Sequence, residues 1–169
     1  MAMPSEKVLL ADIVRACRSV GLDPILIGNA AAALQGAPVT TRDVDFFVRD
    51  SEANRRRIER LAGLLGDLAV THPGEPLSDM TRLVGGPVEI DFVFHLSSGA
   101  RFESLRSRAV DIRFSDVNVR VASLADIIAS KRATGRPKDL AVLPVLEQTA
   151  RVLEKMEQDA WGAPPRGRS

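Results

Sequence analysis

Two aspartates separated by a single residue, Asp43 and Asp45, are the side chains of this sequence best placed to do chemistry. They lie in the run DVDFFVR, in which Val44, Phe46 and Val48 alternate with them as in a half-buried strand. Both carboxylates therefore project from one face of the strand, with α carbons about 6.5 to 7 Å apart. Like charges this close repel one another and raise each other's pKa. A divalent cation that prefers oxygen ligands, such as Mg²⁺, would remove that repulsion.

A third carboxylate, Asp91, lies in the clearest strand pattern of the chain, residues 88–95. Val88, Ile90, Phe92 and Phe94 fall on one face of that run, and Asp91 falls on the other with Glu89, Val93 and His95. If this strand pairs with strand 43–49, the three carboxylates converge on one site that can hold a metal–triphosphate complex. The alternative is that Asp91 is a polar-face residue paired with an arginine.

A strand-to-helix turn that can bind an anion is predicted upstream of Asp43 and Asp45. The apolar run PILIG, 24–28, predicts a short buried strand, and NAAAALQG, 29–36, predicts a helix that begins directly after Gly28. Free backbone N–H groups at a helix start bind anions, and Asn29 is a suitable N-cap residue. The sequence therefore predicts a phosphate site beside the carboxylates.

The order and spacing of GNAAAALQG, TTRDVDF and VEIDFVF resemble the nucleotidyltransferase superfamily that includes DNA polymerase β. The resemblance runs from about residue 24 to 146 and is closer to the bacterial abortive-infection (AbiE-type) toxin branch and its uncharacterised relatives. That branch carries a Lys followed eight positions later by an Asp, which here are Lys131 and Asp139 in SKRATGRPKD.

The resemblance implies that Asp43, Asp45 and Asp91 hold Mg²⁺ or Mn²⁺, and that Asp91 also helps to deprotonate an attacking hydroxyl. It implies an enzyme that moves a nucleoside monophosphate from a nucleoside triphosphate to an RNA end or a protein hydroxyl. A small antitoxin is a further implied partner.

The same resemblance assigns the phosphate contacts. Gly28 and Asn29 would contact the triphosphate, and Lys131 would face phosphate with Asp139 supporting it. Relatives have Ser or Gly where this chain has Asn29, and the bulkier amide can either donate to the phosphate or crowd it. From the residues alone, Lys131 is equally a surface residue of a helix, and Asp139 stabilises a helix N-terminus just after Pro137.

Two other classes of function remain open. A non-catalytic protein of the same fold, acting as a binding or regulatory partner, is favoured by Asn29. An RNA-binding module would use Arg101, Arg106, Arg108 and Arg113. The net charge of +1 and an aromatic content of only 4% argue against that second class.

The composition predicts one domain, residues 1–158, followed by a mobile tail over 159–169. No apolar run is long enough to span a membrane, and the first residues lack the pattern of a leader peptide, which predicts a cytoplasmic protein. The single cysteine, Cys17, lies on an apolar helix face and is expected to be a buried hydrophobe.

The expected fold is mixed α/β (α+β), a nucleotidyltransferase-like twisted sheet of about five strands flanked by helices, with a C-terminal helical region. Helices are predicted over 6–20, 29–36, 51–65, 123–134 and 137–158, with Ser5, Ser51 and Ser123 as N-caps and a kink or restart at Pro144. Strands are predicted over 24–28, 43–49 and 88–95, with two more short ones within 67–86. Residues 97–107 are predicted to be a polar loop, and 109–122 to form a hairpin around Ser115 and Asp116.

Overall fold

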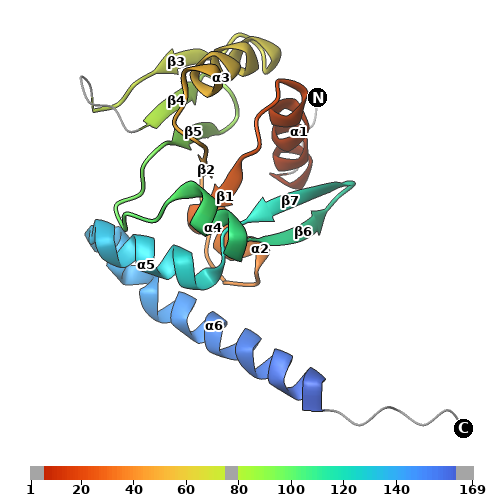
Figure 1. Cartoon of the computed structure of the whole chain (residues 1–169), viewed down its shortest axis with the longest axis vertical. Coiled ribbons are helices and arrows are strands. Elements are labelled where there is room, and N and C mark those ends of the chain that lie inside the picture. The colour runs from red at the N-terminus through yellow and green to blue at the C-terminus, as the bar shows by residue number, and fades with distance from the viewer. Residues whose placement is uncertain (1–5, 75–79, 163–169) are drawn as a thin grey trace, which may run out of the picture.

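A seven-stranded mixed sheet forms the centre of the protein (Figure 1). The computed structural model describes residues 6–74 and 80–162. The strands are β1 (Ile25–Ile27), β2 (Asp43–Phe47), β3 (Ala69–Thr71), β4 (Met80–Val84), β5 (Glu89–Val93), β6 (Val110–Phe114) and β7 (Val117–Val121). They lie in the order β3-β4-β5-β2-β1-β7-β6. The mixed α/β class is confirmed, with seven strands in place of about five.

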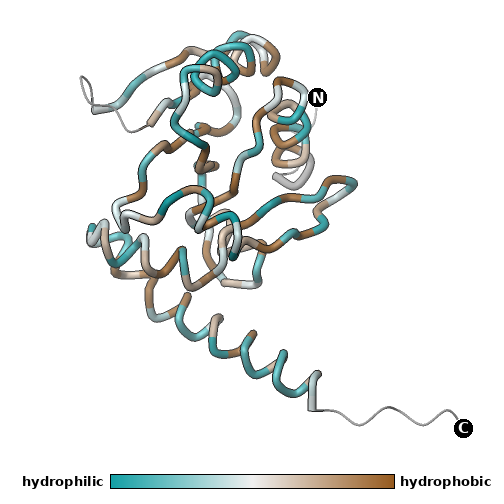
Figure 2. Tube along the Cα trace, viewed as in Figure 1, coloured by the Kyte–Doolittle hydropathy of each residue, from teal (hydrophilic) through white to brown (hydrophobic). Residues whose placement is uncertain are grey.

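Six helices flank the sheet within the described part of the chain: α1 (Glu6–Ser19), α2 (Gly28–Leu34), α3 (Glu52–Leu64), α4 (Phe102–Arg108), α5 (Leu124–Thr134) and α6 (Pro137–Gly162). Figure 1 shows α5 beside the first part of α6, while the C-terminal part of α6 runs away from the sheet. Hydrophobic and hydrophilic residues interleave along the helices in Figure 2, as expected for helices that cover a core on one side. No described helix is both long enough and apolar enough to cross a membrane.

Two parallel strands at the centre of the sheet, β2 and β5, place the candidate residues. Asp45 is the register partner of Asp91 in this pair. Asp91 is in turn the partner of Arg82 on the antiparallel strand β4. Residues in register share a face of the sheet, so the side chains of Asp45, Asp91 and Arg82 form one lateral row across three strands. The predicted pairing of strands 43–49 and 88–95 is confirmed.

The opposite face of the same two strands is core. The rings of Phe46 and Phe92 are fully buried and stack with centroids 5.6 Å apart. Such a pair is worth about 0.5–1.5 kcal/mol beyond the area it buries. The stacked rings fix β2 against β5, and with them the positions of the carboxylates on the other face.

Cys17 also lies in the core and is fully buried, as predicted. Burial raises the pKa of its thiol to about 12, so the thiol stays protonated at neutral pH.

The helix caps at Ser51 and Ser123 are confirmed, because each hydroxyl accepts a hydrogen bond from the backbone N–H three residues later. Ser5 lies outside the described residues. The predicted loop over 97–107 is wrong in part, since α4 begins at Phe102. Phe102 and Leu105 are the only buried residues of that seven-residue helix, and the Phe102 ring packs on Phe47 with centroids 5.4 Å apart. Two apolar positions are too few to show a helical period in sequence.

Of the kink or restart predicted at Pro144, the restart is wrong, because α6 continues through the proline. A proline leaves the carbonyl four residues earlier without its helical hydrogen bond. That residue is Leu140, which is 48% exposed, so water can reach this turn. Leu146, fully buried against the core, holds the following turn in place. The helix extends to Gly162, into the predicted tail, and residues 163–169 lie outside the described part of the chain.

Candidate active site

All seven residues singled out from the sequence line one cleft, which has a volume of about 540 Å³. Its wall is built from the N-terminal turn of α2, one face of β2 and β5, the facing side of α5 and the start of α6. The lining residues predicted from sequence are Gly28, Asn29, Asp43, Asp45, Asp91, Lys131 and Asp139. Elements more than 100 residues apart in sequence therefore meet at this cleft.

The turn at Gly28 brings the backbone against the carboxylate of Asp45. Gly28 has a φ of +68°, a conformation that side-chain-bearing residues rarely adopt. A Cβ atom at this position would lie 2.6 Å from Oδ2 of Asp45, closer than real Cβ contacts. Glycine is therefore required both by the turn and by the carboxylate beside it.

Asn29 is not the N-cap that the sequence predicted. The residue in the capping position is Ile27, and no side chain caps the helix. Because the chain turns at Gly28 directly out of the strand, Asn29 already belongs to the first helical turn and comes too late to cap it. Its Oδ1 atom is buried and has no hydrogen-bond partner among the described residues. An unsatisfied buried polar atom costs about 1–3 kcal/mol, which a ligand in the cleft can recover.

Asp43 and Asp45 are half-buried, and no described side chain forms an ion pair with either of them. Burial, followed by the charges of Asp91 and Asp43, raises the pKa of Asp45 to about 7, while Lys131 opposes the rise. The raised pKa means that the ionised form is poorly compensated by the protein itself. The repulsion expected from the sequence is therefore present in the structure.

Asp91 is 5% exposed and is held by Arg82 from the neighbouring strand. Nε of Arg82 donates to Oδ1 of Asp91 at 2.7 Å, and Nη2 donates to Oδ2 at 2.9 Å. The same guanidinium lies 3.6 Å from a carboxylate oxygen of Glu89. The hydrogen bond to Asp91 raises the pKa of Arg82 above its usual range. The sequence offered two alternatives for Asp91: a third carboxylate of the site, or a polar-face residue paired with an arginine. In the structure Asp91 lies in register with Asp45 and also pairs with Arg82.

Lys131 and Asp139 meet on the opposite wall of the cleft. Nζ of Lys131 lies 3.6 Å from Oδ1 of Asp139, and their side chains are only 12% and 5% exposed. Arg136 donates to the other oxygen of Asp139 at 2.6 Å. Burial alone would raise the pKa of Asp139, but the hydrogen bond from Arg136 and the charges of Arg136 and Lys131 lower it below its usual value. Lys131 is thus a positioned, nearly buried cation facing the carboxylates.

A divalent cation fits part of this site. The carboxylates of Asp43 and Asp45 are hard oxygen donors on one face, and the raised pKa of Asp45 shows that a nearby cation would be favourable. Within residues 6–74 and 80–162, however, no three acidic, imidazole or thiol side chains stand together as a complete ligand set. The third carboxylate, Asp91, lies in register with Asp45, and each of its oxygens accepts one hydrogen bond from Arg82.

Sequence reasoning missed Arg82 and Arg136. Arg136 was visible inside SKRATGRPKD, three residues before Asp139, a spacing at which side chains on a helix turn meet. Arg82 had only a weak signal, an arginine between the buried residues Thr81 and Leu83. Its partner could not be identified without the strand register.

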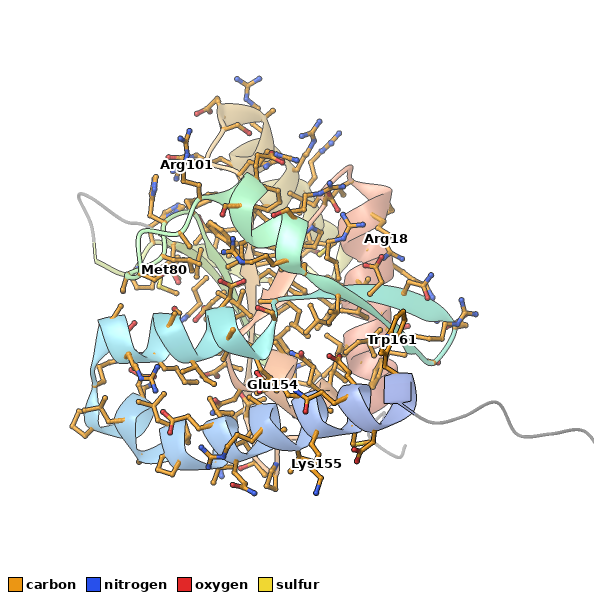
Figure 3. All side chains as sticks on the ribbon, turned by 60° about the horizontal axis from the view of Figure 1, so that its bottom comes forward. Arg18, Met80, Arg101, Glu154, Lys155 and Trp161 are labelled. Atoms are coloured by element: carbon orange, nitrogen blue, oxygen red, sulfur yellow. The ribbon has the colours of Figure 1, made fainter. Side chains whose placement is uncertain are left out.

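The arginine group proposed as an RNA guide does not form one surface. Arg106 lies 3.3 Å from Asp23, and Arg108 lies 2.8 Å from Asp126. Arg113 is exposed on β6 and outside the cleft. Arg101 lines a second cavity, of about 400 Å³, at the start of α4, where Figure 3 shows it at the surface. These positions give little support to a nucleic-acid-binding face built from the four residues.

The chain matches known proteins in its structure but not in its sequence. No protein-family model matches the chain, and no curated protein matches its sequence. Solved structures do match. A candidate nucleotidyltransferase from Thermotoga maritima superimposes with a TM-score of 0.60 over 85% of this chain and 93% of its own, at 18% identity. The antibiotic-resistance factor ANT(2″)-Ia superimposes with a TM-score of 0.62 over 93% of each chain, at 16% identity.

This chain has the nucleotidyltransferase fold. A third structure with the same fold, the lincosamide antibiotic adenylyltransferase LnuA with lincomycin bound, gives a TM-score of 0.61 over 88% of this chain and 99% of its own, at 10% identity. Identities this low establish a shared arrangement of the chain. What the nucleotidyltransferase-fold cleft does here depends on its own residues.

Proposed function

We propose that this protein transfers a nucleoside monophosphate from a nucleoside triphosphate to an acceptor hydroxyl. The observation that carries the proposal is the convergence, in one cleft of the nucleotidyltransferase fold, of a glycine turn, three carboxylates and a nearly buried lysine. These are the groups that in-line transfer at phosphorus requires: an anion site, a cation site and a base.

The anion site is the turn at Gly28 together with Lys131. Gly28 lines the cleft against Asp45, and the backbone N–H groups at the start of α2 would donate to the phosphate there. Lys131 adds a positive charge held in place by Asp139. Between them they would hold the triphosphate, and the side-chain N–H group of Asn29, which lines the same cleft, would donate to it.

The cation site is the pair Asp43 and Asp45, with Asp91 beside it. Mg²⁺ or Mn²⁺ held there would offset negative charge on the phosphate and on the attacking and leaving oxygens. Among the protein's own groups, Asp91 is the one we assign to accept the proton of the attacking hydroxyl. The bond that forms joins the hydroxyl oxygen to the α-phosphorus. The bond that breaks joins the α-phosphorus to the oxygen that bridges to the β-phosphate, so that pyrophosphate leaves. The proton of the hydroxyl passes to the carboxylate of Asp91.

We base the acceptor and the biological setting on the family resemblance alone. The resemblance to the abortive-infection branch favours an RNA end or a protein hydroxyl as acceptor, and a role as the toxin of a toxin–antitoxin pair with a small antitoxin partner. A small neighbouring gene in the same operon would support that setting.

A second candidate function is a non-catalytic protein of the same fold. Two observations favour it: Arg82 occupies both oxygens of Asp91, and Asn29 introduces bulk where the triphosphate would lie. Such a protein would bind nucleotide or a partner without transfer.

The experiment that separates the two is incubation with each α-labelled nucleoside triphosphate, Mg²⁺ and total cellular RNA or protein. We expect label in one acceptor fraction. Asp91→Asn keeps the shape of the side chain but removes its basicity, and positioned base catalysis is worth about 10²–10⁴-fold in rate. Transfer should fall by that factor while nucleotide affinity changes far less. Nucleotide binding without transfer by any nucleotide or acceptor would establish the non-catalytic function instead.

A further inference from the structure

The contact between Arg82 and Asp91 is unlike the other ion pairs of the sheet. Both oxygens of a 7% exposed carboxylate are engaged by two donors of one guanidinium, at 2.7 and 2.9 Å. Parallel donors of this kind fix the plane and the direction of a carboxylate as well as its charge. A lysine could supply the charge but not the plane.

The geometry leaves part of Asp91 free. An ionised carboxylate has about four lone-pair sites, and the two hydrogen bonds from Arg82 use one on each oxygen. Arg82 reaches Asp91 from β4, while Asp45 lies on β2, on the other side of β5. Each oxygen therefore keeps a lone pair that Arg82 does not use, on a carboxylate that lines the cleft in register with Asp45.

The charges around Asp91 also indicate that it depends on Arg82. Asp43, Asp45, Glu89 and Asp91 place four carboxylates on two adjacent strands, and Arg82 is the described cation that contacts Asp91 and Glu89. Lys131 and Arg136 instead pair with Asp139. Without Arg82, a buried carboxylate would face another carboxylate with no counter-charge in contact.

We propose that Arg82 is a positioning residue for Asp91: it holds both carboxylate oxygens from the β4 side and so fixes the orientation of the carboxylate beside Asp45, where a divalent cation and the attacking hydroxyl would lie. This inference rests on the proposed function for its chemical meaning. Residues that hydrogen-bond to a metal-ligating group typically change metal affinity by 10–100-fold when they are replaced.

The test compares Arg82→Gln and Arg82→Lys by Mn²⁺ titration of the nucleotide-free protein and by thermal unfolding. We expect Arg82→Gln to weaken Mn²⁺ binding at least 10-fold and to lower the Tm by on the order of 10 °C, since it leaves a buried charge unpaired. Arg82→Lys should keep much of the Tm but not the Mn²⁺ affinity, because one ammonium cannot hold both oxygens.

A matched control exists on the other side of the sheet. Arg120 on β7 pairs with its register partner Asp111 on β6, at 3.3 Å, and is 29% exposed against 32% for Arg82. Arg120→Gln should leave Mn²⁺ affinity unchanged. In the background of Asp91→Asn, replacing Arg82 by Gln should add little further loss of Mn²⁺ affinity, because the group it positions is gone.

Three results would overturn the inference. Full Mn²⁺ affinity in Arg82→Lys would mean that only charge matters. Tighter Mn²⁺ binding in Arg82→Gln would mean that Arg82 competes with the cation. Absence of Mn²⁺ binding by the unaltered protein would remove the cation beside which Asp91 is held. None of these measurements needs transfer, so a protein that shows the expected affinities without transferring nucleotide would refute the proposed function and leave the role of Arg82 standing.

Discussion

A Cβ atom at Gly28 would lie 2.6 Å from Oδ2 of Asp45, so the phosphate turn and the first carboxylate of the cleft are built against each other. Gly28→Ala must therefore displace Asp45 in addition to straining a backbone with φ at +68°. We expect it to destabilise the fold by about 1–3 kcal/mol and to abolish measurable nucleotide binding. Urea unfolding and calorimetry measure the two effects.

Gly36→Ala is the matched control for this change. Gly36 also has a positive φ, +97°, but nothing lies within 4 Å of a Cβ at that position. It should lose stability through backbone strain and retain nucleotide binding. Equal effects on binding from the two substitutions would contradict a specific role for the contact with Asp45.

The raised pKa of Asp45 predicts a pH dependence of stability. Between its ordinary value of 3.8 and about 7, the folded protein binds more protons at this group than the unfolded chain does. The contribution of Asp45 to the free energy of unfolding is therefore least unfavourable below pH 4 and worsens as the pH rises to about 7. Asp45→Asn should remove this part of the profile.

The measurement is the urea midpoint at a series of pH values from 4 to 8 with a chelator present, for the unaltered protein and Asp45→Asn. The difference between the two curves should grow with pH in favour of the variant and then level off. Addition of Mg²⁺ above pH 7 should stabilise the unaltered protein and not the variant, since only the former has the carboxylate. A constant difference between the curves would contradict the raised pKa.

Lys131 should contribute directly to the binding of a triphosphate. One hydrogen bond to a charged group is worth about 1.5–3 kcal/mol, so Lys131→Met should weaken nucleotide binding by about 10- to 150-fold. Lys155→Met, on the exposed part of α6 in Figure 3, is the control and should bind normally. Isothermal titration with Mg²⁺ and a non-hydrolysable triphosphate distinguishes the two. Similar affinity in both variants would place Lys131 outside the phosphate site.

Asn29 should show opposite effects on stability and on binding. Its buried Oδ1 has no partner, so Asn29→Ser should stabilise the ligand-free protein by about 1 kcal/mol. If the amide serves the ligand, the same change should weaken triphosphate binding by about 1.5–3 kcal/mol. Asn118→Ser, at an exposed position on β7, should change neither. Tighter binding in Asn29→Ser would mean instead that the amide crowds the triphosphate.

The sequence by itself determined the features that depend on local periodicity and on single-residue chemistry. Alternation in 43–48 and 88–95 placed Asp43, Asp45 and Asp91 opposite the apolar residues, because successive strand residues face opposite sides. Gly28 marked the turn, and Ser51 and Ser123 marked helix starts, because each requirement is met by one residue type within a few positions.

Tertiary structure decided what depends on contacts between distant elements. The pairing of Arg82 with Asp91 follows from the register of β4 on β5, and a shift of one residue would have turned Arg82 to the other face. The continuity of α6 through Pro144 depends on the burial of Leu146, and the existence of α4 depends on the packing of Phe102 on Phe47. These outcomes are set by non-local packing energy, which no window of sequence contains.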